Sequence, residues 1–176
     1  MTTTRRSIVA VIGTGDMGSA VGKALVRAGY RVVTAGVGRS ELSRRLAAAA
    51  GIEDLGSLEQ AVRGAGLVLS IVPPATATSF AADVARALAT AATRPTFVDC
   101  NAVAPATVLA IERTIGPTRA AFADCGIRAQ ARLRNRCLVQ VLGGESRPPA
   151  LDLLVPAQIF RLVRGPARVQ LGRQHL

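Results

Sequence analysis

Three glycines near the N-terminus are spaced so that backbone N–H groups can bind a phosphate. They lie in the run VAVIGTGDMG at residues 9–18. In a G-x-G-x-x-G turn the first glycine makes a tight turn, the second lets the backbone approach a pyrophosphate, and the third lets helix and strand pack closely. The free N–H groups and the positive end of the helix then bind the phosphates. The pattern predicts dinucleotide binding by Gly13, Thr14, Gly15, Asp16, Met17 and Gly18; a glycine-rich turn without a ligand is the alternative.

The segments on either side of this turn have the patterns that it requires. Residues 7–12 form an apolar run typical of a buried strand, and apolar residues at helical spacing follow until Gly29. Further strands are expected at 30–35, near 52, at 67–72, 96–99 and 120–125, alternating with helices at 40–50, 57–64, 75–92 and 104–115. Ser40 and Ser57 are candidate helix caps, and Gly51 is a candidate left-handed helix end. This alternation predicts an α/β, Rossmann-type, doubly wound and mostly parallel sheet.

The alternating pattern ends after Ile127. Residues 127–176 hold 9 of the 22 basic residues but 2 of the 11 acidic ones, and paired glycines and prolines interrupt them. We therefore expect an NAD(P)-binding domain at 1–127 and an irregular, basic, Arg/Pro-rich C-terminal tail at 128–176, whose degree of order the sequence leaves open.

Composition limits the partners. No apolar run approaches the roughly 18 residues that span a bilayer, and no signal peptide is recognisable, so no membrane partner is expected. The three cysteines, at 100, 125 and 137, are widely spaced, which favours free thiols in a reducing cytoplasm. The net charge of +11 comes almost entirely from arginine, and only 3% of residues are aromatic, so no specific nucleic-acid role is expected. No metal site is predicted.

The end of the second expected strand bears on the choice of nucleotide. NAD-specific proteins usually have an acidic side chain there, which binds the ribose hydroxyls. No Asp or Glu lies between Asp16 and Glu41, whereas Arg39 and Ser40 supply a cation and a hydroxyl. These residues favour NADP over NAD; a solvated surface arginine is the alternative.

Two later strand ends carry further candidate residues. Val72 and Pro73 begin a proline-stiffened loop that suits a fixed wall against the nucleotide, although a simple strand terminator explains the same residues. Asn101 follows the next strand, and its amide can both donate to and accept from a carboxamide, hydroxyl or carboxylate. Capping of the following helix is the alternative role for Asn101.

Three segments together resemble the β-hydroxyacid dehydrogenase superfamily. They are the first motif with methionine before its third glycine, Ser-Ile-Val-Pro-Pro at 70–74, and Asp-Cys-Asn-Ala-Val-Ala-Pro at 99–105. The superfamily includes 3-hydroxyisobutyrate and 6-phosphogluconate dehydrogenases, and the resemblance covers roughly residues 7–127. It implies NADP-dependent hydride exchange with a small hydroxy acid or an imine, and a homodimer in complete family enzymes.

The resemblance also implies site residues. The dinucleotide would contact Gly13, Gly15, Met17 and Gly18, with Arg39 and Ser40 at its adenosine end, Val72 and Pro73 near its nicotinamide, and Asn101 and Val103 beside nicotinamide or substrate.

The chain also departs from the family. Family enzymes carry a catalytic lysine on a later helix, whereas the only lysine here, Lys23, lies in the first expected helix, and the only histidine, His175, is penultimate. No catalytic residue is therefore assigned. We expect a chain truncated or frame-shifted after about residue 127, with an authentic short variant as the alternative. A catalytically incompetent dinucleotide-binding module is the alternative function.

Overall fold

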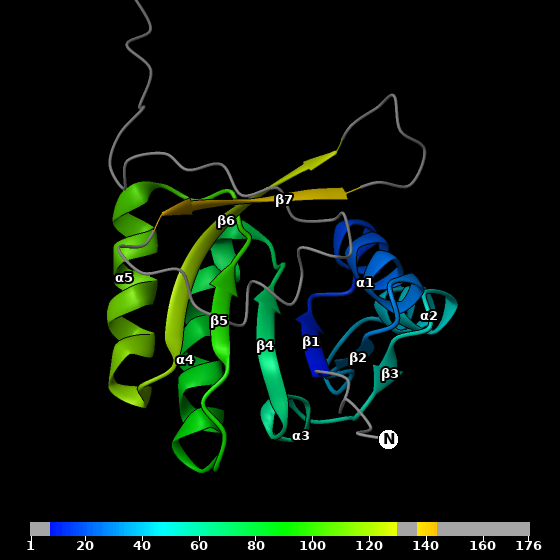
Figure 1. Cartoon of the computed structure of the whole chain (residues 1–176), viewed down its shortest axis with the longest axis horizontal. Helices are drawn as coiled ribbons and strands as arrows, with labels where there is room; N and C mark the ends of the chain where they lie inside the picture. The colour runs from blue at the N-terminus through cyan, green and yellow to red at the C-terminus, as the bar shows by residue number, and fades with distance from the viewer. Residues whose placement is uncertain (1–7, 130–136, 144–176) are drawn as a thin grey trace, which may run out of the picture.

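The computed structural model describes residues 8–129 and 137–143, which form one seven-stranded sheet with helices on both faces (Figure 1). The strands are β1 (Ile8–Ile12), β2 (Arg31–Thr34), β3 (Glu53–Asp54), β4 (Ala65–Ser70), β5 (Thr96–Asp99), β6 (Ala121–Ala129) and β7 (Cys137–Gly143). The helices are α1 (Asp16–Arg27), α2 (Glu41–Ala49), α3 (Leu58–Val62), α4 (Ala77–Ala89) and α5 (Pro105–Ile115), with 3-10 turns η1 (Pro74–Thr76) and η2 (Gly116–Thr118).

The strand order is β3-β2-β1-β4-β5-β6-β7. Strands β1 to β6 pair in parallel, and β7 pairs antiparallel with β6. The order reverses between β1 and β4, which is the doubly wound arrangement that leaves a crevice at the carboxyl ends of these two strands. The predicted Rossmann-type α/β fold is confirmed.

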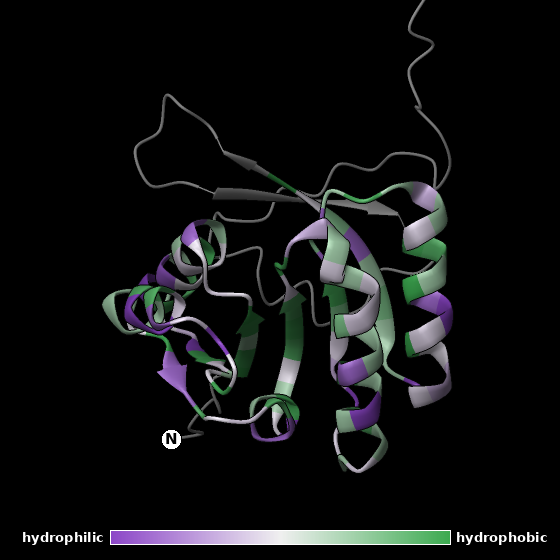
Figure 2. Cartoon of the chain, turned by 180° about the vertical axis from the view of Figure 1, so that it is seen from behind, coloured by the Kyte–Doolittle hydropathy of each residue, from purple (hydrophilic) through white to green (hydrophobic). Residues whose placement is uncertain are grey.

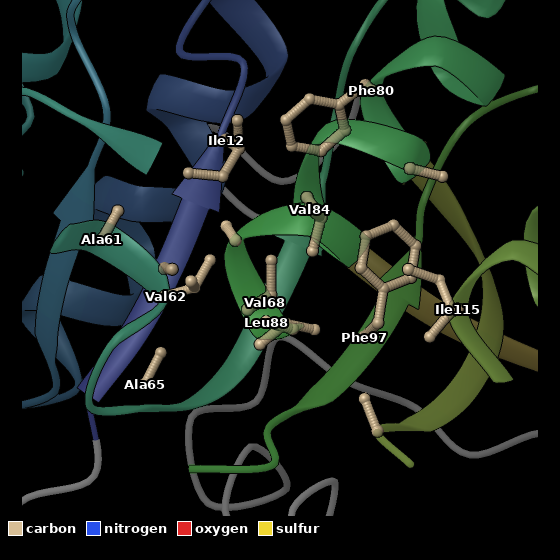
Figure 3. Packing of buried hydrophobic residues seen from close by; sticks show 14 of the residues in the cluster. Ile12, Ala61, Val62, Ala65, Val68, Phe80, Val84, Leu88, Phe97 and Ile115 are labelled. Carbon is tan, nitrogen blue, oxygen red and sulfur yellow. The ribbon is translucent and has the colours of Figure 1, made fainter. Parts of the chain in front are cut away.

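Two hydrophobic layers hold the helices on the sheet. One face of the central strands contributes Ile12, Val68 and Phe97 to a cluster with buried residues of α3, α4 and α5 (Figure 3). The other face contributes Val9, Val11, Leu67, Leu69 and Val98 to a second cluster, with α1 and α2. The central strands are buried on both faces, as their nearly continuous apolar sequences require. In Figure 2, α4 and α5 lie side by side over the first face, with hydrophilic residues on their outer surfaces.

The predicted capping residues lie at the ends of the helices. The Ser40 hydroxyl accepts a hydrogen bond from the Ser43 N–H, and Ser57 forms a reciprocal capping box with Gln60. Gly51 ends α2 in the left-handed region, with φ of 75°. These predictions are confirmed. They were possible from sequence because each feature depends on neighbours within four residues.

Strand β7 lies within the segment expected to be an irregular tail. It pairs with the second half of β6, which itself runs two residues past the predicted boundary to Ala129. The sequence analysis did not foresee this strand, and the division into 1–127 and 128–176 stays a prediction, because residues 130–136 and 144–176 lie outside the described ones. Within the described ranges, no helix is both long enough and apolar enough to cross a bilayer.

Candidate functional site

The glycine turn lies at the carboxyl edge of the sheet, between β1 and α1 (Figure 1). Gly13 has φ of 90°, and a Cβ there would lie 2.0 Å from the backbone oxygen of Ile71, just past β4. A Cβ at Gly18 would lie 2.0 Å from the Gly13 oxygen. A Cβ at Gly15, by contrast, would meet nothing within 4 Å. The first and third glycines therefore permit close backbone packing, whereas the second faces open space.

This open space suits a pyrophosphate. Gly15 is the N-cap of the 12-residue helix α1 and is exposed, so the helix presents its free N–H groups and its positive dipole end there. Asp16 and Met17 are also exposed in the first turn, with Met17 39% exposed. The negative charge of the Asp16 carboxylate stabilises the start of the helix. Because that charge would repel a phosphate, Asp16 would bind a phosphate only through its backbone N–H.

Thr14 has a structural role in addition to its place in the turn. Its side chain is buried, and its hydroxyl donates a hydrogen bond to the Ser43 carbonyl of α2 at 3.1 Å. The Ser40 hydroxyl in turn donates to the Ser43 hydroxyl at 3.1 Å. These bonds join the glycine turn to the start of α2, so the two ends of the predicted nucleotide site are held at a fixed separation.

Arg39 lies in the loop after β2 and is partly exposed. Its N–H donates to the Gly36 carbonyl at 3.1 Å, which closes the loop as a turn. The ion pairs among the described residues are Arg31 with Glu53 and Arg86 with Asp83, so the Arg39 guanidinium has no carboxylate partner within the part of the chain that the structure describes. An unpaired guanidinium at this edge is available to an anionic ligand.

Asp54, at the end of β3, is a candidate site residue that the sequence analysis missed. One of its carboxylate oxygens, Oδ1, accepts hydrogen bonds from the N–H groups of Gly36 and Gly56, both at 2.8 Å. The other, Oδ2, lies 1.9 Å from where a Cβ of Gly36 would stand. A carboxylate therefore occupies the position of the absent side chain at residue 36. Spacing along the chain does not reveal this contact, because it depends on the pairing of β2 with β3.

Asn101 joins the ends of β4 and β5. Its Oδ1 accepts from the Val72 N–H at 2.8 Å, and its Nδ2 donates to the Ser70 hydroxyl at 3.0 Å and to the Asp99 carboxylate. Both amide protons are thus used within the protein, leaving one acceptor lone pair on Oδ1 for a ligand. Asn101 does not cap α5, whose N-cap is Ala104 without a side-chain hydrogen bond.

The network of Asn101 fixes the remaining predicted residues. Val72 is buried, and its Cγ1 lies 3.1 Å from where a Cβ of Gly13 would stand, so this strand end touches the glycine turn. Pro73 is exposed beside it and leads into η1. The Val103 N–H donates to the Asn101 carbonyl at 3.0 Å. The structure thus brings residues 13, 72 and 101 to one edge, as their strand ends predicted.

A pair of carboxylates lies beneath this edge. Asp99 and Asp124 are register partners on β5 and β6, and Asp99 is fully buried, with Oδ2 lacking a hydrogen-bond partner. Burial raises the pKa of Asp99 to about 6, although the N–H of Asn101 opposes the shift; the charge of Asp124 adds to it. Burial also raises the pKa of Asp124. Asp99 is thus a positioning residue for Asn101. The negative charge of Asp99 is costly to bury.

This burial predicts a pH-dependent stability. A folded-state pKa of about 6 for Asp99, against about 3.9 in the unfolded chain, means that the folded chain binds more protons between these values. The free energy of unfolding therefore falls as pH rises from 4 to 6, by about 2 to 3 kcal/mol from this group. We expect Asp99→Asn to reduce this fall, measured by urea unfolding at several pH values. Asp83→Asn, at a half-exposed carboxylate that pairs with Arg86, is the control. If the pH dependence of Asp99→Asn equals that of this control, the assignment is contradicted.

The other reactive side chains in the described residues lie away from the edge or are inaccessible. Cys100 and Cys125 are free and buried, which confirms the prediction of free thiols for these two; the side chain of Cys137 lies outside the description. Burial raises the pKa of both described thiols, so they are poor nucleophiles. Lys23 is exposed in a groove between α1 and α2. It lies two helical turns along α1 from the glycine turn.

Comparisons with known proteins agree with this geometry. Residues 8–103 match the family described as NADP oxidoreductase coenzyme F420-dependent. No curated protein sequence matches the chain. One similar solved structure is a conserved protein of unknown function, described as similar to 3-hydroxyacid dehydrogenases. It has 25% identity and a TM-score of 0.75, and the match covers 90% of this chain and 58% of that one.

Two further structures show the same fold. One is the 3-hydroxyisobutyrate dehydrogenase of Mycobacterium tuberculosis with L-serine, at 19% identity and a TM-score of 0.74, covering 92% of this chain and 55% of that one. The other is an imine reductase from Myxococcus stipitatus in complex with NADP+, at 19% identity and a TM-score of 0.67, covering 89% and 54%. The chain thus spans little more than half the length of these structures. The chain shares its fold with a structure described as similar to 3-hydroxyacid dehydrogenases, and by its family match it belongs to the NADP oxidoreductase coenzyme F420-dependent family.

Proposed function

We propose that this chain binds NADP(H) at the carboxyl edge of its sheet and is the nucleotide-binding part of an oxidoreductase. The single observation that carries the proposal is the contrast among the three glycines: two pack against backbone, and Gly15 faces open space at the start of α1. The pyrophosphate would bind at residues 13–18, the adenosine end beside Arg39 and Ser40, and the nicotinamide beside Val72, Pro73 and Asn101. Bound nicotinamide supplies or accepts a hydride.

The proposed reaction is hydride exchange with a small hydroxy acid or an imine, in keeping with the enzymes to which the chain is similar. In this proposal the chain's own residues bind and orient the nucleotide: Asn101 holds the ends of β4 and β5 together, and Val103 borders the substrate. A cytoplasmic location, a small-molecule substrate and a homodimer of the complete enzyme belong to the same proposal.

A second candidate function is nucleotide binding without catalysis. Hydride loss from an alcohol needs a base for the hydroxyl proton, which typically contributes 10²- to 10⁴-fold to the rate. The position of Lys23, two turns along α1, favours this second function, because it is the only lysine of the chain and lies away from the nicotinamide end. Steady-state assays with hydroxy acids and cyclic imines, and with NADPH or NADP+, separate the two functions.

Substitution of Gly15 tests the nucleotide site itself. We expect Gly15→Ala to leave the fold intact, because its φ of −69° suits any residue and its Cβ meets no atom. The added methyl enters the space proposed for the pyrophosphate, so NADPH affinity should fall roughly 5- to 150-fold, as for an overpacked contact. Fluorescence titration of NADPH measures the affinity, and circular dichroism checks the fold.

Gly116→Ala is the matched control. Its Cβ also meets nothing within 4 Å, but it follows α5 at the opposite edge of the sheet. We expect this variant to bind NADPH as the wild type does. Equal affinities of the Gly15 variant and the control would contradict the proposed site.

A further inference from the structure

A carboxylate stands beside the proposed adenosine end although the second strand ends without one. The strand β2 ends at Thr34, and Gly36 lies two residues further on, in the loop where NAD-specific proteins usually have an acidic residue near the strand end. Gly36 has no side chain, and the Asp54 carboxylate fills that space, with Oδ2 at 1.9 Å and Cγ at 2.6 Å from the position of the missing Cβ. Any residue other than glycine at 36 would displace this carboxylate.

The position of the carboxylate is fixed from two sides. Its Oδ1 accepts from the N–H groups of Gly36 and Gly56, while the Gly36 carbonyl accepts from the Arg39 N–H. Gly36 therefore binds both neighbours through its backbone: its N–H binds the Asp54 carboxylate, and its carbonyl binds the backbone of Arg39. Both hydrogen bonds use Oδ1, and Asp54 is an exposed residue, so within the described part of the chain no hydrogen bond engages Oδ2.

We infer that Asp54 is a specificity-determining residue that opposes Arg39 in the choice between NADPH and NADH, an inference that rests on the proposed function. Arg39 attracts the 2′-phosphate of NADPH, whereas the Asp54 carboxylate repels it and accepts a hydrogen bond from the free ribose hydroxyl of NADH. The site therefore prefers NADPH less strongly than it would if Arg39 were present without Asp54. It also accepts NADH.

The isosteric variant Asp54→Asn isolates the charge. The amide oxygen still accepts from both glycine N–H groups, so the loop keeps its shape. We expect the ratio of NADPH affinity to NADH affinity to rise about tenfold, because one nearby negative charge is removed. Titration of both nucleotides by fluorescence measures the ratio. The fragments 2′,5′-ADP and ADP, measured by calorimetry, should show the same change, since they carry the adenosine end alone.

Glu53→Gln is the matched control. It removes the same charge from the neighbouring residue of β3, whose side chain pairs with Arg31 instead. We expect its ratio to stay within about twofold of wild type, because its charge is already paired with Arg31 and is screened by solvent. If Asp54→Asn proves unstable by thermal melting, Asp54→Ser, which keeps an acceptor for the Gly56 N–H, replaces it with the same expected change.

The outcomes are distinguishable. A wild-type chain that binds neither nucleotide overturns the proposed function and this inference with it. Wild-type binding with an unchanged ratio in Asp54→Asn, or an equal loss for both nucleotides, overturns the inference alone and leaves the nucleotide site standing. A raised ratio in Asp54→Asn but not in Glu53→Gln supports it.

Discussion

Replacing Gly13 by alanine should remove about 2 to 5 kcal/mol from the free energy of unfolding, as two costs add. Its φ of 90° is a conformation that costs an L-residue about 1 to 2 kcal/mol. The new Cβ would also lie 2.0 Å from the Ile71 backbone oxygen. Because a Cβ is held rigidly on its own backbone and this oxygen cannot rotate away, the ends of β1 and β4 would have to separate. Urea unfolding followed by circular dichroism measures the loss, which is a large share of the 5–15 kcal/mol typical of a domain.

Two other glycines separate these costs. Gly38 has φ of 74°, but a Cβ there meets nothing, so Gly38→Ala should show the backbone strain alone, about 1 to 2 kcal/mol. Gly18 lies within α1, and Gly18→Ala should show the steric overlap with the Gly13 oxygen, reduced by alanine's better helix propensity of about 1 kcal/mol. A Gly13 variant no less stable than the Gly38 variant would contradict the close packing of β1 against β4.

Replacing Arg39 by alanine should weaken NADPH binding roughly 10- to 150-fold while sparing NADH, because a charge-assisted hydrogen bond contributes about 1.5 to 3 kcal/mol. The reason is that Arg39 is the cation of the loop after β2 and has no carboxylate partner among the described residues. Titration of both nucleotides against wild type and variant measures the effect. It should weaken with added salt, since the contact is partly exposed.

Arg63→Ala is the control for net charge. Arg63 ends α3 and precedes β4, so it lies at the opposite edge of the sheet and is exposed. We expect it to leave both affinities unchanged. Equal losses for NADPH and NADH in the Arg39 variant, or tighter NADH binding by the wild type, would refute a 2′-phosphate role for Arg39 and with it the preference for NADP.

Much of the fold was predictable from sequence because its signals are local. The glycine turn, the caps at Ser40 and Ser57 and the left-handed Gly51 depend on residues within one or two turns of each other. The continuous apolar run of β4 predicts a strand covered on both faces, and alternation of strands and helices predicts parallel pairing. Local sequence patterns are therefore sufficient to predict the Rossmann class and the place of the glycine turn.

Contacts between side chains of different strands, by contrast, depend on how the strands pair. Asp54 reaches Gly36 only because β3 pairs with β2, and 18 residues separate them in sequence. Asn101 offered an amide to a ligand or a helix, yet its donors bond Ser70 and Asp99, because β4 and β5 end side by side. β7 likewise depends on pairing with β6. Such contacts follow from register and strand order, which set the charge and the free hydrogen-bonding groups at the edge where a ligand would bind.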